Sequence, residues 1–276
     1  MEIIKKVMLA FVTIFVTTIE TKAQKDFCLN PVISFQGGER LSFRVYYNMG
    51  ALWINAGNVV FSINNEIIDN HKVFHVIGSG KTAKSYDLFF KVDDRYQTYI
   101  DEETMLPYKF IRKVNEGGFK IDNTVVFDQK KKKAVSDTSV FTIPKNTQDV
   151  LSAIYFARNI DYSKYKPGDK IPFNMFLDNK VYPLYVKYIG KEKVKTRMGE
   201  YNAIKLVPLL IDGTIFKGGE KMVIWITDDN NHVPLRVSSP ILVGSIKVDL
   251  LNYENLKHPF SSIIAKTTEK EADTEY

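Results

Sequence analysis

Residues 245–250 read Ser-Ile-Lys-Val-Asp-Leu, and this hexapeptide is the clearest indication of the fold. Successive side chains of an extended strand point to opposite faces, so an apolar residue at every second position predicts a half-buried strand. Here the apolar residues Ile246, Val248 and Leu250 alternate with the polar residues Ser245, Lys247 and Asp249.

The same alternation recurs through most of the chain. Val59, Phe61 and Ile63 form one such series, and Val125 and Phe127 belong to another. Clusters of Asn, Asp and Gly separate these runs, and such residues favour tight turns. Strands joined by short turns must be mostly antiparallel, because a parallel pair needs a crossover of about a dozen residues or more. The sequence therefore predicts an all-β protein.

One segment, residues 147–160, breaks the alternation and is rich in helix formers. Thr147 is a plausible N-cap, and Asp149 would lie in the first turn, where a carboxylate interacts favourably with the helix dipole. Apolar residues leave little of the circumference polar, so we expect this helix to be buried against sheet on more than one side.

These patterns predict two mostly antiparallel, curved sheet units, forming a sandwich or a barrel-like structure and linked by the helix at about 147–160. The first unit spans residues 39–146 and the second spans residues 161–258. Residues 24–38 form an N-terminal extension. Residues 259–276 carry no apolar period in their last part, and we expect a frayed tail there.

The N-terminus resembles a secretory signal peptide. Lys5 and Lys6 precede an apolar run of about thirteen residues, which would span roughly 20 Å as a helix, less than the roughly 30 Å hydrocarbon core of a bilayer. Small residues before position 24 predict cleavage after Ala23 and a periplasmic or secreted protein, an uncleaved anchor being the alternative. Lys25-Asp26-Phe27 is a poor lipid-attachment sequence, which disfavours a lipoprotein anchored through Cys28.

Composition limits the kind of partner. The chain has 276 residues with 38 basic and 32 acidic side chains, and removing residues 1–23 takes the formal charge from +6 to +5. The aromatic content argues against disorder, and a single Cys cannot close an intramolecular disulfide. No basic helix or zinc-finger pattern is present, so we expect no nucleic-acid partner.

Searching for catalytic and cofactor motifs gives no match. Gly80-Lys81-Thr82 resembles the end of a phosphate-binding loop, but His75 stands where the required earlier Gly would be. The four histidines form no zinc-binding pair, and no Gly-x-Ser-x-Gly occurs. We therefore expect no catalytic residue, metal or cofactor, although carboxylates from distant strands could still meet in a cleft.

Tyr46 and Trp53 are the candidate ligand-binding residues. In a strand, Phe43, Val45 and Tyr47 share one face and Tyr46 lies on the other, where its ring could stack on a sugar or cover an acyl chain. The alternative is that Tyr46 and Trp53 fill a second buried layer, as aromatic residues in β-rich chains commonly do.

Several stretches resemble the exported bacterial family called domain of unknown function 3108. They are residues 38–48 (Gly-Glu-Arg-Leu-Ser-Phe-Arg-Val-Tyr-Tyr-Asn), 52–57 (Leu-Trp-Ile-Asn-Ala-Gly), 225–229 (Trp-Ile-Thr-Asp-Asp) and 233–235 (Val-Pro-Leu). Thr227 and His232 depart from the Ser and Arg that the family prefers. The resemblance implies an all-β envelope protein, similar to the YmcC-like fold of capsule-operon lipoproteins, with no established activity.

Three functional hypotheses follow. The first is a non-catalytic cell-envelope module that binds an envelope glycan, lipid or protein. The second is a periplasmic lipid or lipoprotein carrier, with the helix at 147–160 as a lid. The third is a glycan-active enzyme that uses carboxylates from distant strands.

Overall fold

The computed structural model describes residues 32–48, 53–83, 91–116, 118–137, 139–211, 218–241 and 244–266. The predicted signal peptide, Cys28 and residues 267–276 lie outside these ranges.

Strands dominate both halves of the chain. The N-terminal half contains β1 (Arg40–Asn48), β2 (Trp53–Ile68), β3 (His71–Thr82), β4 (Asp93–Asp101), β5 (Pro107–Glu116), β6 (Phe119–Asp128), β7 (Lys133–Ser136) and β8 (Ser139–Thr142). Next come β9 (Thr147–Gln148), α2 (Val150–Arg158) and the 3-10 turn η1 (Tyr162–Lys164). The C-terminal half contains β10 (Lys170–Leu177), β11 (Lys180–Thr196), β12 (Gly199–Pro208), β13 (Val223–Thr227), β14 (Pro234–Pro240), β15 (Ser245–Glu254) and β16 (Ile263–Lys266).

All sixteen strands belong to one sheet. The order is β8-β7-β6-β5-β4-β3-β2-β1-β15-β14-β13-β12-β11-β10-β9, and β16 pairs with β12 outside this path. Only the short β9–β10 pair is parallel among the described pairings. The prediction of a mostly antiparallel all-β fold is therefore confirmed.

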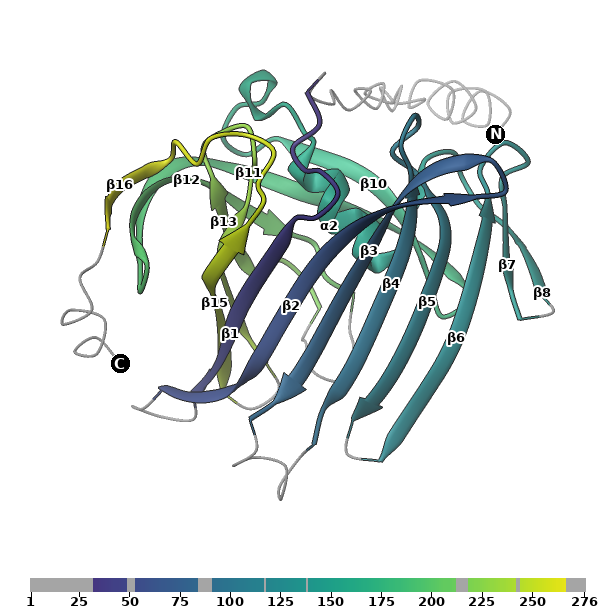
Figure 1. Cartoon of the computed structure of the whole chain (residues 1–276), viewed down its shortest axis with the longest axis horizontal. Coiled ribbons are helices and arrows are strands. Elements are labelled where there is room, and N and C mark those ends of the chain that lie inside the picture. The colour runs from purple at the N-terminus through teal and green to yellow at the C-terminus, as the bar shows by residue number, and fades with distance from the viewer. Residues whose placement is uncertain are drawn as a thin grey trace, which may run out of the picture.

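The two predicted β units are two halves of this continuous sheet. They join through β1, which pairs with β15 along its whole length. Figure 1 shows the sheet curving so that β3–β6 and β10–β12 lie on opposite sides of α2. The curved sheet does not close, because β8 and β9, at the two ends of the strand order, do not pair with each other within the described residues.

The main core lies on the inner side of this curve, around α2. Leu151 and Tyr155 pack on the N-terminal half of the sheet, together with Phe35 from the chain before β1. Phe156 and the following Ile160 pack on the C-terminal half. Helix α2 thus packs against both halves of the sheet. Apolar residues around most of its circumference are therefore buried, as the sequence predicts.

Helix α2 begins later than predicted. Its N-cap is Asp149, and the expected N-cap Thr147 lies instead in β9. The Asp149 carboxylate accepts hydrogen bonds from the backbone N–H groups of Leu151 and Ser152, both at 2.8 Å, and the Ser152 hydroxyl accepts one from the Asp149 N–H. This capping box satisfies helix-end donors that the Thr147 side chain would leave unpaired.

A buried ion pair ties α2 to the start of β1. Arg158 and Glu39 have side chains that are 2% and 0% exposed. Arg158 Nη1 and Nη2 donate to the two Glu39 carboxylate oxygens at 2.6 and 2.8 Å. Arg158 Nε also donates to the carbonyl of Asn231, in the β13–β14 turn, at 3.1 Å. One guanidinium thus connects three segments that are distant in sequence.

The ordered chain extends into the region predicted to be a frayed tail. Phe260 packs against Tyr253 and Tyr201, with ring centroids 4.4 and 5.7 Å away. β16 then adds to the edge of β12 through Tyr201 and Gly199. The packing of Phe260 and the pairing of β16 therefore attach residues 260–266 to the sheet, although their sequence has no clear apolar period.

Candidate functional site

The two candidate residues from the sequence meet over one lysine. Tyr46 lies in β1 directly opposite Lys247 in β15, and Trp53 begins β2. Lys247 Nζ lies 5.6 Å from the centroid of the Tyr46 ring and 4.7 Å from that of Trp53. Both distances suit a cation–π interaction.

The exposure of the two rings differs. Phe43 packs in the core, and Tyr46 lies on the opposite, outer face of the strand, as the alternation predicts. Tyr46 is nevertheless only 3% exposed. Arg197, in the β11–β12 hairpin tip, reaches it and donates from Nη1 to the Tyr46 hydroxyl at 3.0 Å. Trp53 is half-buried, so Trp53 and Lys247 present the accessible surface of this cluster.

Beside this cluster a row of side chains crosses five adjacent strands on the same outer face. In antiparallel pairs, directly opposite residues share a face and lie close together. The register gives this row as Lys205 in β12, Trp225 in β13, Arg236 in β14, Asp249 in β15 and Arg44 in β1.

Asp249 lies between the two arginines of the row. Its carboxylate is fully buried and accepts hydrogen bonds from Arg236 Nε at 2.6 Å and from Nη2 at 2.7 Å. Arg236 Nη1 donates to the Lys195 carbonyl at 2.9 Å, which fixes the guanidinium plane. Arg44 pairs in register with Asp249 from the other side. This part of the row therefore contains two arginines and one carboxylate, and its formal charge is positive.

Trp225 occupies the middle of the row. Its Nε1 donates to Glu192 at 2.6 Å, and Lys205 Nζ lies 5.4 Å from its ring. The hydrogen bond from Trp225 is the main reason that the pKa of Glu192 lies below its usual range. Desolvation raises this pKa by less, and Lys205 lowers it further. Glu192 therefore stays ionised and orients both the ring and the lysine.

A third aromatic–lysine pair extends the surface to β10 and β11. Lys170 Nζ lies 4.2 Å from the ring of Tyr185 and donates to its hydroxyl at 3.0 Å. The Tyr185 hydroxyl donates to Glu220 at 2.5 Å, and Lys187 also pairs with Glu220. Hydrogen bonds from Lys187 and Tyr185 lower the pKa of Glu220 to about 2.

We name this surface the basic–aromatic face. It carries six basic and three acidic side chains, so its charge is positive at neutral pH. Its members are Arg44, Tyr46, Trp53, Lys170, Tyr185, Lys187, Glu192, Lys205, Glu220, Trp225, Arg236, Lys247 and Asp249.

Sequence reasoning found only Tyr46 and Trp53 of these residues. The alternation at residues 245–250 assigns Lys247 and Asp249 to the polar face of a strand. It does not show which residues of neighbouring strands lie next to them. Their partners come from strands up to two hundred residues away along the chain, and the register that joins them is not written in any local motif.

The packing of Tyr46 gives a first prediction. Tyr46→Phe keeps the ring beneath Lys247 but removes the acceptor for Arg197, and we expect a loss of about 1 kcal/mol in the free energy of unfolding. Tyr46→Ala removes the buried ring as well and should cost about 3 kcal/mol or more. Urea unfolding followed by circular dichroism measures both. A Tyr46→Ala protein as stable as the parent would contradict the observed burial.

Two further properties concern cofactors and membranes. No group of three His, Cys, Asp or Glu side chains within the described ranges is arranged to hold a metal ion. The helices in those ranges are too short or too polar to cross a bilayer.

Comparison with solved structures identifies proteins of similar fold. A β-barrel-like protein of the DUF1849 family from Brucella abortus superposes with a TM-score of 0.53 at 11% identity, covering 82% of this chain and 99% of that one. This likeness concerns the fold alone.

Two other solved proteins match less closely. One is a candidate lipoprotein from Parabacteroides distasonis, with 10% identity, a TM-score of 0.37 and coverage of 81% and 99% of the two chains. The other is a candidate exported protein with a YmcC-like fold from Bacteroides fragilis, with 12% identity, a TM-score of 0.33 and coverage of 83% and 100%. TM-scores this low do not establish a shared fold. No curated protein matches the chain.

The sequence itself gives the family. The profile described as "Protein of unknown function (DUF3108)" matches residues 42–251, which contain most of β1, all of β2 to β14 and most of β15. The match includes the stretches at residues 52–57, 225–229 and 233–235 and confirms the resemblance predicted from them. The chain therefore belongs to the DUF3108 family.

Proposed function

We propose that the chain is a non-catalytic, exported cell-envelope protein that binds an acidic glycan on its basic–aromatic face. The observation that carries this proposal is the combination of cations and rings across β10–β15 and β1. Three aromatic side chains, Tyr185, Trp225 and Trp53, each lie against a lysine on this face.

The chemistry of an acidic polysaccharide is complementary to this arrangement. Its carboxylates would pair with the lysines, and the apolar faces of its sugar rings would stack on the indole and phenol rings. Neighbouring strands are about 4.8 Å apart, so the row from Lys205 to Arg44 spans roughly 19 Å and can contact several consecutive sugar units. A linear polymer fits such a row better than a small molecule does.

The ordered geometry of the face also supports binding. Glu192 holds Trp225, Asp249 holds Arg236, and Glu220 holds Tyr185 through hydrogen bonds of 2.5 to 2.7 Å. Side chains that are already fixed lose less conformational entropy when a ligand binds.

Replacing two lysines tests the proposal. We expect Lys205→Ala/Lys247→Ala to weaken binding of polygalacturonate about tenfold, because two charge-assisted contacts are lost. The matched control is Lys72→Ala/Lys133→Ala, which removes the same charge from exposed positions in the N-terminal half. Isothermal titration calorimetry measures affinity, and thermal unfolding checks that each variant is folded.

Three results would count against the proposal. Equal losses in the test and control variants would mean that only net charge matters. If the protein bound a neutral glucan as tightly as polygalacturonate, the carboxylates of the polymer would not contribute to binding. Preferential binding to phosphatidylglycerol vesicles over polygalacturonate would favour a lipid partner instead.

A further inference from the structure

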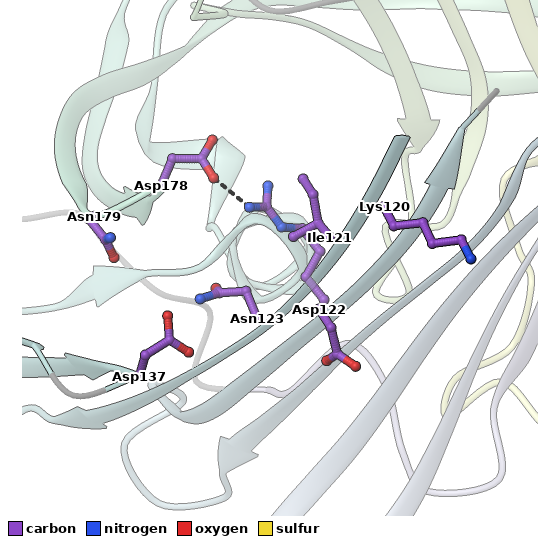
Figure 2. A pocket seen from close by; sticks show the side chains of 8 residues that line it. Lys120, Ile121, Asp122, Asn123, Asp137, Asp178 and Asn179 are labelled. Carbon is purple, nitrogen blue, oxygen red and sulfur yellow. Dashed lines mark hydrogen bonds and ion pairs between the residues drawn. The ribbon is translucent and has the colours of Figure 1, made fainter. Parts of the chain in front are cut away.

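A hollow lies where β5 and β6 of the N-terminal half approach the β10–β11 turn of the C-terminal half, and it is separate from the basic–aromatic face. It has a volume of about 380 Å³. We name it the seam pocket and define it by Arg112, Asn123, Asp137, Asp178 and Asn179, with Ile121, Lys120 and Asp122 completing the lining. Figure 2 shows that Asn123, Asp137, Asp178 and Asn179 gather on one side, whereas Lys120 and Asp122 project away from them.

The pocket combines elements that are distant in sequence. Arg112 in β5 lies directly opposite Asn123 in β6. Asp178 and Asn179 form the two-residue turn between β10 and β11, with positive φ angles of 49° and 61° that Asp and Asn tolerate well. This tight turn brings two polar side chains of the C-terminal half to the N-terminal half of the sheet.

A buried guanidinium forms part of the pocket wall. The Arg112 side chain is only 9% exposed, and Nη2 donates to Asp178, as the dashed line in Figure 2 marks. No acceptor among the described residues bonds to its other nitrogens, and Nε is fully buried without a partner. A guanidinium that is desolvated and only partly paired has donor capacity to offer a ligand.

The other groups add acceptors and one further donor set. Asn123 Nδ2 donates to Ser136 Oγ at 3.0 Å, which orients its amide. The carboxylates of Asp137 and Asp178 are hydrogen-bond acceptors, the Asn179 amide can donate and accept, and Ile121 supplies an apolar surface.

This set of groups discriminates between ligand charges. Arg112 and Asp178 neutralise each other, so the carboxylate of Asp137 is left to repel an anion. A metal ion or an ammonium group offers no acceptor to the incompletely paired Arg112 guanidinium. An uncharged molecule with several hydroxyl groups would satisfy the donors and acceptors without either penalty. The hollow is open to solvent, and its volume lies at the lower end of the range for small-ligand sites.

We propose that the seam pocket binds an uncharged sugar residue through its hydroxyl groups. The inference is independent of the acidic glycan assigned to the basic–aromatic face, because the residues and the charge preference both differ. The ligand bridges the two halves of the sheet, since its contacts come from β5, β6 and the β10–β11 turn.

Titration of the ¹⁵N-labelled mature chain with the methyl glycosides of glucose, galactose, mannose and N-acetylglucosamine tests the assignment. At least one should bind saturably, with an affinity on the order of millimolar, and shift amide signals of β5, β6 and residues 178–179. Asp137→Asn/Asp178→Asn keeps the turn conformations and should weaken binding about tenfold. Asp93→Asn, at an exposed position in β4 that does not line the pocket, should leave the affinity unchanged.

The assignment is overturned if none of the four glycosides binds, or if the shifted signals lie elsewhere. It is also overturned if Asp93→Asn weakens binding as much as the double variant does. Tighter binding of methyl glucuronide than of methyl glucoside would refute the preference for an uncharged ligand. Both variants change exposed side chains, so each should fold normally.

Discussion

Replacing Arg158 by Ala is expected to lower the free energy of unfolding by about 3–5 kcal/mol. The substitution leaves the fully buried carboxylate of Glu39 without its partner and removes the hydrogen bond to the Asn231 carbonyl. It also removes the guanidinium that lies 5.5 and 5.2 Å from the rings of Phe35 and Tyr155. Urea unfolding of the variant and the parent protein gives the loss directly.

A double variant separates the ion pair from the packing. Glu39→Gln/Arg158→Met replaces both charges by neutral side chains of similar size. Because removing both partners of a buried pair leaves no isolated charge, this variant should lose much less stability than Arg158→Ala. If Arg158→Ala cost less than about 1 kcal/mol, the buried pair would not hold α2 to β1 as described.

The second large effect concerns Asp149 and depends on pH. This carboxylate is completely buried, and Thr98 Oγ1 donates to it at 2.6 Å from β4. Burial raises the pKa of Asp149 from 3.8 to about 6, although the hydrogen bonds from Thr98, Ser152 and Leu151 act in the opposite direction. The side chain is therefore mainly ionised at neutral pH, where it caps α2.

The sign of the pH dependence follows from this raised pKa. Between 3.8 and about 6 the folded protein binds more protons at Asp149 than the unfolded chain does. Acidification from about pH 7 to about pH 4 therefore stabilises the folded state through this group, by up to about 3 kcal/mol, and the gain is lost again as the pH rises through 6.

Comparison with Asp149→Asn isolates this effect. Asn also caps helices but does not titrate, and all other groups contribute equally to both proteins. We expect the stability of the parent relative to Asp149→Asn to increase by about 2–3 kcal/mol on acidification from pH 7 to pH 4. Asp149→Ala, which loses the cap, should cost about 2 kcal/mol at pH 7. Parallel stability curves for parent and Asp149→Asn would contradict a raised pKa.

Local sequence patterns were sufficient to predict the element types. The alternation at residues 245–250 predicted β15, and the loss of alternation after residue 146 located α2. The N-cap was misplaced because Thr147 and Asp149 are both good capping residues. The pairing of Asp149 with Ser152 and the bond from Thr98, fifty-one residues earlier, decide between them.

The candidate sites were less predictable, because they depend on the register between distant strands. A single sequence gives no means of pairing Asp249 with Arg236, or Arg112 with Asp178. The alternation marks Lys247 only as part of the polar side of a strand, and does not show that its Nζ lies over the rings of Tyr46 and Trp53. The aromatic residues could be singled out by type, whereas their charged partners became visible only in the folded sheet.

The most direct test of acidic-glycan binding compares one polymer in two charge states. Polygalacturonate and its carboxyl-reduced form share a backbone, and only the first carries charge. We expect the parent protein to bind polygalacturonate at least about tenfold more tightly than the reduced polymer, and we expect this difference to shrink as salt screens the charges. Equal affinity for the two polymers, or affinity that does not change with salt, would contradict the assignment of the basic–aromatic face.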